Sequence, residues 1–395
     1  MQRVYFDNNA TSPLLPEVFE AMRPYFGEKF GNASSIHQQG QQARGAVERA
    51  REQVAALLNC RPAEIVFTSG GTEGDNLALF GLAKPGDHVI TSAIEHHAVL
   101  NSCHRLQEMG CVVTYLPVDG RGLVDPEDVR RALRLETKLI SIMFANNETG
   151  VLQALPEIGK IAAEADVNFH TDAVQAAGKV PVDVQQIGCD LLTISAHKFH
   201  GPQGTGALFV RKGTLLQPLL YGGRHERSRR AGTENLPGIV GLGKAAEIAL
   251  QGFSDGKIAQ MEALRDRLEK ALLENVEQAA VNGGGGAPRT PNTANISFDC
   301  VEGEAMVIAL DLKGLAVSTG AACSSGAIEP SHVLTAMGLS PDRARGSIRF
   351  SLGKQNTAED VEFALALVPE VVARLREISP LYKRAAVSHQ PSALR

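Results

Sequence analysis

Two ionisable side chains follow short apolar runs of the kind that form buried strands. Asp172 ends the run NFHTD at 168–172, and Lys198 comes soon after the run DLLTIS at 190–195. A buried carboxylate is costly unless it meets a cation or hydrogen-bond donors, and a buried lysine can become neutral and nucleophilic. One strand–helix–strand crossover separates the two residues, so they can face each other across a ligand. A simple buried ion pair is the alternative.

A glycine-rich turn offers a third chemical group. The run IVFTS at 65–69 leads into Gly70, Gly71 and Thr72 and then into a helical segment. Small residues let backbone N–H groups approach a ligand, and the N-terminus of a helix attracts an anion such as phosphate. The turn is neither a Walker A loop, since the following lysine is missing, nor the GxGxxG dinucleotide motif. A tight turn without any ligand is the alternative.

A phosphate cradle, an acid and an amine together match one cofactor, pyridoxal 5′-phosphate (PLP). PLP presents a phosphate, a ring nitrogen that must stay protonated and an aldehyde, and its ring accepts electrons from the bound substrate. The sequence therefore predicts a PLP site in which Asp172 meets the ring nitrogen and Lys198 meets the aldehyde.

The elements that must position these groups alternate between apolar runs and helical segments. The runs that read as buried strands are 65–69, 87–91, 111–116, 139–144, 168–172, 190–195 and 206–210. The helices expected between them include 76–82, 98–109 and 156–165. This alternation predicts an α/β fold with a mostly parallel central sheet covered on both faces. Ligands of such sheets bind beyond the carboxyl ends of the strands, where Asp172 and Lys198 are expected.

The C-terminal part of the chain has a different character. A helix with 3.6-residue periodicity is expected at 256–277, and strands are expected at 293–298, 314–319 and 347–353. Mixed strands and helices of this kind predict a smaller α+β region.

Composition excludes several classes of protein. The 395 residues include 39 Lys and Arg against 44 Asp and Glu, a net charge of −5, so no basic field is available to grip nucleic acid. No apolar run approaches the ~20 residues that cross a bilayer, and the N-terminus has no signal-peptide pattern. The six cysteines form no CxxC pair, which argues against a zinc ribbon or a disulfide framework. We expect a cytoplasmic enzyme that binds neither membranes nor nucleic acid.

Nine segments, in order along nearly the whole chain, resemble cysteine desulfurases of the NifS/IscS type. They are DNNAT (7–11), FTSGGTEGDNLAL (67–79), EHHAVL (95–100), NNETG (146–150), TDAVQ (171–175), SAHKFHGPQGTGAL (195–208), RAGTEN (230–235), GAACSSGAIEPSHVL (320–334) and SIRFSLG (347–353). The resemblance implies a fold-type I PLP-dependent transferase, like aspartate aminotransferase, and a homodimer with active sites near the subunit interface. The implied reaction converts L-cysteine to L-alanine and leaves the sulfur as an enzyme persulfide.

The resemblance also implies roles for individual residues. Lys198 matches the lysine that binds the cofactor aldehyde and then moves protons at the substrate carbons. Asp172 matches the partner of the pyridine nitrogen, and His96 matches the imidazole stacked on the ring. Gln175 matches a donor to the phenolic oxygen, and Asn147 lies beside that oxygen and the substrate carboxylate.

The same enzymes bind a phosphate and a substrate carboxylate. Arg349, in SIRFSLG, matches the arginine whose planar fork binds both carboxylate oxygens. The phosphate contacts map to Gly71, Thr72, Ser195 and His197 and, from the other subunit, Thr233.

Cys323 matches the sulfur acceptor, and it lies in a stretch of small residues, 319–326. A thiolate must attack the substrate sulfur, so this cysteine is expected to be accessible and easily ionised. The resemblance implies an iron–sulfur scaffold protein of the NifU/IscU type as the acceptor of the sulfur. We expect no intrinsic metal, although Cys323 could transiently ligate a nascent iron–sulfur cluster. The other cysteines are expected to be inert packed thiols: Cys60, Cys103, Cys111, Cys189 and Cys300.

Two domains are expected: a large PLP-binding domain at 15–255, and a small α+β domain at 1–14 and 256–395 that carries the Cys323 loop.

Two other functions compete with desulfuration. One is a different fold-type I PLP enzyme, such as a selenocysteine lyase or a class V aminotransferase, and Cys323 discriminates because a transaminase needs no thiol there. The other is an assembly partner without catalysis, which the set Lys198, Asp172 and His96 argues against.

Overall fold

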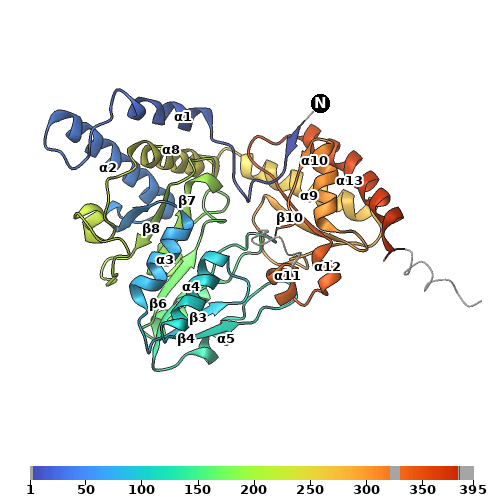
Figure 1. Cartoon of the computed structure of the whole chain (residues 1–395), viewed down its shortest axis with the longest axis horizontal. Coiled ribbons are helices and arrows are strands. Elements are labelled where there is room, and N and C mark those ends of the chain that lie inside the picture. Colours follow the sequence, from blue (N-terminus) through green and yellow to red (C-terminus); the bar gives the residue numbers. More distant parts are fainter. Residues whose placement is uncertain (1–2, 321–329, 381, 383–395) are drawn as a thin grey trace, which may run out of the picture.

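The computed structural model describes residues 3–320, 330–380 and 382. Figure 1 shows two parts, with the strands β2 to β8 in one of them and the elements from α9 onward, together with the N-terminal strand β1, in the other. No helix among the described residues combines the length and apolar character needed to cross a membrane.

The larger part is built on a seven-stranded sheet. Its strands are β2 (Ile65–Thr68), β3 (His88–Ser92), β4 (Val112–Leu116), β5 (Thr137–Ser141), β6 (Asn168–Asp172), β7 (Leu191–Ser195) and β8 (Gly206–Val210). They lie in the order β2-β8-β7-β6-β5-β3-β4, and β8 alone runs antiparallel to the other six strands. The predicted α/β fold with a mostly parallel central sheet is confirmed.

Helices cover both faces of this sheet (Figure 1). They are α1 (Pro16–Met22), α2 (Gln38–Leu58), α3 (Gly71–Leu82), α4 (His97–Glu108), α5 (Pro126–Ala132), α6 (Leu155–Glu164), α7 (Val184–Ile187) and α8 (Leu236–Gly252), with 3-10 turns η1 (Arg23–Phe26), η2 (Pro62–Glu64), η3 (Ala196–Lys198) and η4 (His225–Ser228). Along β2, Ile65 and Phe67 pack in the core that contains α2 and α8, whereas Val66 packs with α3. Alternate residues of a strand point to opposite faces, so an uninterrupted apolar strand serves both layers.

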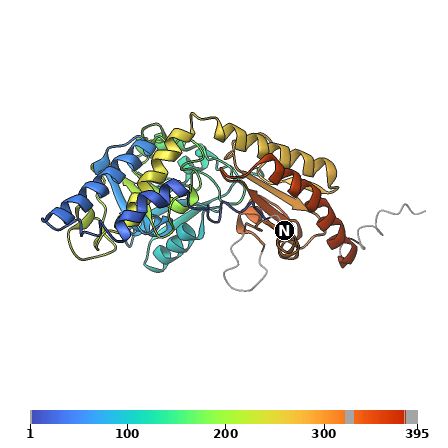
Figure 2. The same ribbon diagram turned by 90° about the horizontal axis from the view of Figure 1, so that it is seen from above.

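The smaller part contains a three-stranded antiparallel sheet in the order β12-β10-β9. Its strands are β9 (Ala279–Val281), β10 (Thr293–Phe298) and β12 (Ser347–Ser351), and its helices are α9 (Lys257–Asn275), α10 (Gly303–Leu312), α11 (His332–Ala336), α12 (Pro341–Arg345) and α13 (Ala358–Ile378). Figure 2 shows α9 and α13 side by side along this part. Strand β1 (Val4–Tyr5) pairs in parallel with β11 (Leu315–Ala316), and Phe6 lies in the core formed by these helices and strands.

Three expected elements differ from the structure by three or more residues at one end. Helix α3 begins at Gly71 rather than at 76, because the glycine-rich turn itself forms the first helical turn. Strand β5 ends at Ser141 rather than at 144, although the N–H groups of Ile142 and Phe144 still donate to carbonyls of β6. The strand expected at 314–319 is reduced to Leu315–Ala316, since its partner β1 is only two residues long. The domain limits at residues 14 and 255 stay a prediction.

Candidate active site

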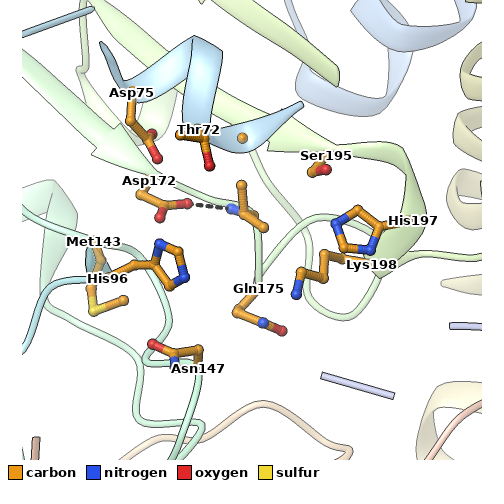
Figure 3. A pocket seen from close by; sticks show the side chains of 12 residues that line it. Thr72, Asp75, His96, Met143, Asn147, Asp172, Gln175, Ser195, His197 and Lys198 are labelled. Atoms are coloured by element: carbon orange, nitrogen blue, oxygen red, sulfur yellow. Dashed lines mark hydrogen bonds between the residues drawn. The ribbon is translucent and has the colours of Figure 1, made fainter. Parts of the chain in front are cut away.

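A pocket of about 250 Å³ lies where the carboxyl ends of β6 and β7 meet the N-terminus of α3 (Figure 3). Its lining residues are Gly71, Thr72, Asp75, His96, Met143, Asn147, Asp172, Val174, Gln175, Ser195, His197 and Lys198. Nine of them are predicted site residues, so the structure gathers most of that set in one place. Parallel strands β6 and β7 are neighbours, which is why groups at their ends meet.

The N-terminus of α3 closes one end of the pocket with small residues. A Cβ atom on Gly71 would lie 2.8 Å from Cγ2 of Val174, and one on Gly74 would lie 2.6 Å from Cγ2 of Thr193. Only glycine therefore lets the helix approach the strand ends this closely. Because of that approach, the first turn of the helix and Thr72 border the pocket, where the helix dipole favours an anion.

Ser195 and His197 border the same end of the pocket. Ser195 is the last residue of β7, and Nδ1 of His197 lies 3.2 Å from Oγ1 of Thr11. Burial and the charges of Lys198 and Lys179 lower the pKa of His197 to about 4, so its ring is neutral near pH 7. A hydroxyl, a ring N–H and a helix N-terminus form a donor-rich end that suits a phosphate.

Asp172 supplies the acidic group. It is the last residue of β6, and its Oδ1 accepts the backbone N–H of Val174 at 2.8 Å (Figure 3). Burial raises the pKa of Asp172 to about 6, while the Val174 N–H and the charge of Lys198 oppose this rise. A cationic N–H group placed against this carboxylate would lower its pKa and stabilise the ionised form.

Asp75 is a second carboxyl group in the pocket, and sequence reasoning did not single it out. Its Oδ1 has no hydrogen-bond partner among the described residues and lies 3.6 Å from Nε2 of His170. Burial and the neighbouring charge of Asp172 raise the pKa of Asp75. Burial also lowers the pKa of His170 to about 3, so the histidine is no cation for it. Two close carboxyl groups resist double ionisation, and the raised pKa of Asp75 favours its protonated form.

Lys198 reaches the pocket from η3. Its Nζ donates to the carbonyl oxygens of Asn9 at 2.6 Å and Ala10 at 2.8 Å, so the N-terminal segment holds the free amine. Burial and then the charge of Arg349 lower the pKa of Lys198 to about 8, against the opposite effect of Asp172 and Asp7. The amine thus loses its proton more readily than an ordinary lysine, which a nucleophilic role requires.

His96 is the N-cap residue of α4, and its Nδ1 accepts the N–H of Ala98 at 3.1 Å. Burial and the charge of Lys198 lower the pKa of His96 to about 4. The His96 side chain is exposed and borders the pocket (Figure 3). Since Nδ1 is an acceptor, the proton of the neutral ring lies on Nε2.

Gln175 and Asn147 approach the pocket from the side opposite α3 (Figure 3). Nε2 of Gln175 donates to the carbonyl oxygen of Asn9 at 2.9 Å. Oδ1 of Asn147 is buried and has no hydrogen-bond partner among the described residues, which leaves it available to a ligand.

Arg349, on β12, belongs to the smaller part and reaches towards the pocket without lining it. Its two terminal nitrogens donate to Oδ1 of Asp7 at 2.7 Å and to the carbonyl oxygen of Asn147 at 2.9 Å. The side chain is buried, and its Nε has no partner in the described part of the chain. Each terminal nitrogen carries a second hydrogen, so a fork of donors remains for a carboxylate.

Besides Arg349, one other described residue of the predicted site does not line this pocket. Thr233 is exposed in the segment between η4 and α8. Cys323 lies outside the described residues.

The N-terminal segment contributes more than the sequence indicated. Asn9 and Asp7 contact Lys198 and Arg349 directly, although no role was predicted for either. The polar run DNNAT immediately after the apolar VYF was a signal that could have found them, since polar side chains there must have partners.

The remaining cysteines are free thiols in packed surroundings. Cys103, Cys111 and Cys189 are buried, and Cys60 and Cys300 are partly buried. Burial raises the pKa of Cys60 and of Cys103 to about 12, which disfavours the reactive thiolate. Among the residues described, no cluster of His, Cys, Asp or Glu is arranged to hold a metal ion.

The sheet order and the pocket at its strand ends define an α/β enzyme of the fold-type I class. The family model for aminotransferase class-V matches residues 4–363, and the chain belongs to this family.

Relatives and solved structures agree with this assignment. The chain is 50% identical to the cysteine desulfurase IscS of Dictyoglomus turgidum over 97% of its length and 98% of the relative's. It is 51% identical to the cysteine desulfurase IscS of Methanosarcina thermophila, over 96% of this chain and 94% of that protein. A solved NifS-like protein superimposes with a TM-score of 0.88 at 39% identity, covering 95% of this chain and all of the other. A structure of SspA in complex with cysteine matches with a TM-score of 0.79 at 39% identity, covering 89% and 99%.

Proposed function

We propose that this protein is a PLP-dependent cysteine desulfurase that converts L-cysteine to L-alanine and transfers the sulfur to Cys323 as a persulfide. The observation that carries the proposal is one pocket that holds Lys198, Asp172 and His96 beside the N-terminus of α3. The identity of about half of the residues with proteins named cysteine desulfurase supports the choice of reaction.

The pocket fits PLP at each of its chemical groups. The donor-rich end at Gly71, Thr72 and Ser195 suits the phosphate, and the carboxylate of Asp172 suits the ring nitrogen. The unpartnered Oδ1 of Asn147 indicates a side chain whose polar partner is a ligand. When bound, PLP supplies an electron-accepting ring conjugated to the substrate nitrogen.

Lys198 would bind the aldehyde of PLP and, once released, would move protons at the substrate carbons. Its pKa of about 8 places the amine close to the pH at which it both accepts and donates a proton. The carbonyl oxygens of Asn9 and Ala10 hold the released side chain at the pocket. Asp172 would keep the ring nitrogen of PLP protonated, and the neutral ring of His96 would border the cofactor.

Arg349 binds the substrate carboxylate with its remaining N–H groups, beside Asn147. The thiolate of Cys323 then attacks the substrate sulfur. A sulfur–sulfur bond forms, the substrate carbon–sulfur bond breaks, and its electron pair goes to the carbon, which Lys198 protonates. The balance is L-cysteine plus the Cys323 thiol giving L-alanine plus the Cys323 persulfide.

The proposed assembly is a homodimer, with Thr233 contacting the phosphate in the partner subunit. Its exposure in one chain is what such a contact requires. Large apolar side chains stand exposed near the N-terminus of α2: Phe26 by 66%, Phe30 by 72% and Ile36 by 93%. Such a group of side chains is expected where a second subunit covers the surface.

We further propose that a NifU/IscU-type scaffold receives the sulfur, and that the reaction takes place in the cytoplasm, where free thiols persist.

The proposal is tested by comparing the wild type with Cys323→Ala after addition of L-cysteine. We expect the variant to keep the visible absorbance of bound PLP but to form no persulfide, and Cys300→Ala to behave like the wild type. Borohydride reduction and peptide mapping should place a pyridoxyl group on Lys198. Wild-type sulfide release by Cys323→Ala in the presence of reductant would refute the thiol's role, and a tag on another residue would refute the pocket.

A further inference from the structure

Lys179 is a buried cation near the pocket to which the proposed reaction assigns no role. It is only 6% exposed, and its Nζ donates to Oε1 of Gln175 at 2.6 Å and to Oδ1 of Asn9 at 2.9 Å. No carboxylate of the described residues forms an ion pair with it. Burial, followed by the charges of Lys198 and Arg349, lowers its pKa. An ammonium buried without a carboxylate costs stability, so a purely structural reason for it is weak.

The local backbone explains why Lys179 meets Gln175. After β6 the chain forms a helical turn. The N–H groups of Ala177 and Val180 each donate to the carbonyl oxygen four residues earlier. Residues four apart on such a turn lie on the same side, and Gln175 and Lys179 have this spacing. Gln175 borders the pocket, whereas Lys179 is not one of its lining residues.

The contact decides which end of the Gln175 carboxamide faces the pocket. Nζ of Lys179 is the donor in this contact, so the amide atom that meets it is the oxygen. The nitrogen Nε2 therefore points the other way, where one of its hydrogens is donated to the carbonyl oxygen of Asn9. Its second hydrogen remains for a ligand. The carbonyl oxygen of Asn9 can accept only from the nitrogen end of the carboxamide, so Lys179 and Asn9 hold the same orientation of the carboxamide from its two ends.

The second contact orients Asn9 in the same manner. Oδ1 of Asn9 accepts from Lys179 and from Nδ2 of Asn292 at 3.0 Å, so its own Nδ2 must act as the donor. That nitrogen donates to Oγ1 of Thr293 at 2.9 Å and to the carbonyl oxygen of Asn147 at 3.2 Å. The Lys179 side chain thus contacts the oxygen ends of two carboxamides, those of Gln175 and Asn9.

We propose that Lys179 is a positioning residue of the active site, whose contact with Oε1 of Gln175 turns the N–H end of that carboxamide towards the phenolic oxygen of the cofactor. The inference rests on the proposed function, because it assumes that Gln175 faces PLP. Lys179 itself touches neither cofactor nor substrate.

The test compares Lys179→Met, Gln175→Leu and the double variant as PLP-loaded proteins. The measurement is the pH titration of the visible absorbance of bound PLP, together with the thermal midpoint. An N–H donated to the anionic phenolic oxygen stabilises that form, so its loss raises the titration midpoint, by about one to two pH units. We expect Lys179→Met to raise the midpoint in the same direction as Gln175→Leu, and by no more. The double variant should match Gln175→Leu alone, since the two residues act through one hydrogen bond.

Thermal stability separates positioning from simple support. We expect Lys179→Met to melt no lower than the wild type, because the variant removes an unpaired buried charge. Lys354→Met is the matched control, since Lys354 is partly buried with a pKa lowered by burial and does not line the pocket. It should leave the titration unchanged. If Lys179→Met does not fold, Lys179→Gln retains an N–H donor at this position and should shift the midpoint by less than Gln175→Leu does.

Each remaining outcome has a distinct meaning. A wild-type titration in Lys179→Met beside a shifted Gln175→Leu overturns the inference and leaves the proposed function intact. A wild-type titration in Gln175→Leu overturns the role of Gln175 and the inference with it. If borohydride reduction and peptide mapping of the wild type find no pyridoxyl group on Lys198, the proposed function itself is overturned.

Discussion

Arg349→Lys tests how the carboxylate of the substrate is bound. The wild-type guanidinium donates one hydrogen from each terminal nitrogen to Asp7 and to the carbonyl oxygen of Asn147, at 2.7 and 2.9 Å. These contacts hold the plane of the guanidinium and leave a second hydrogen on each nitrogen. A lysine at this position keeps the positive charge, but its ammonium is a point charge without the planar pair of donors. The carboxylate of Asp7 would attract it.

The expected loss follows from this geometry. The variant loses one hydrogen bond between charged groups, worth about 1.5–3 kcal/mol, which corresponds to about a 10- to 150-fold fall in kcat/KM for L-cysteine. The assay measures L-alanine formation from L-cysteine and from its methyl ester, which has no carboxylate. Wild-type protein should prefer the acid strongly, and Arg349→Lys should lose most of that preference.

Arg345→Lys is the matched control, since Arg345 pairs with Asp342 at the surface of the smaller part and lies four residues away. It should preserve the preference for the acid. An equal fall for the acid and the ester in Arg349→Lys would refute the reasoning, because it would show that the arginine supports the structure and does not bind the carboxylate.

Two further predictions concern buried carboxyl groups. Glu226 accepts both terminal nitrogens of Arg51 and the N–H of Phe67, so Glu226→Ala should lower the free energy of unfolding by about 3–5 kcal/mol in urea denaturation, and a change within error would contradict the buried ion pair. Burial raises the pKa of Glu95 from 4.5 to about 8, so its contribution to stability is present below pH 4.5 and is lost as the pH rises through about 8. As the pH rises over this range, the thermal midpoint of Glu95→Gln should therefore rise relative to that of the wild type. A difference between the two midpoints that does not change with pH would show that Glu95 is ionised throughout.

Much of the fold could be predicted from the sequence because its signals are local. Strand β6 matches the predicted 168–172 and β8 matches 206–210, since apolar runs bounded by turn residues mark strands that are buried on both faces. The glycine-rich turn, Asp172 and Lys198 were found by the same reasoning, because costly or conformationally special residues stand out at strand ends. Their roles stay predictions until the experiments above are done.

Other features of the site have no local signal. Asp7 meets Arg349 across 342 positions of the chain, and Asn9 meets Lys198 across 189. Nothing in the residues around position 7 indicates which distant side chain will be its partner. Lys179 likewise has no local signal in the sequence, and only the tertiary structure shows that it is buried and contacts Asn9.

The types of the reactive groups, and their order along the chain, were determined by the sequence alone. The amine, the acid and the glycine turn are present whatever the fold, and alternation of strands and helices brings them to one edge of a parallel sheet. Only the tertiary structure decided the protonation and orientation of these groups. A pKa depends on burial and on neighbouring charges, as for Lys198 beside Arg349, and a carboxamide is oriented by the donor that meets it, as for Gln175 on Lys179. Both are properties of contacts between distant segments, which no local pattern records.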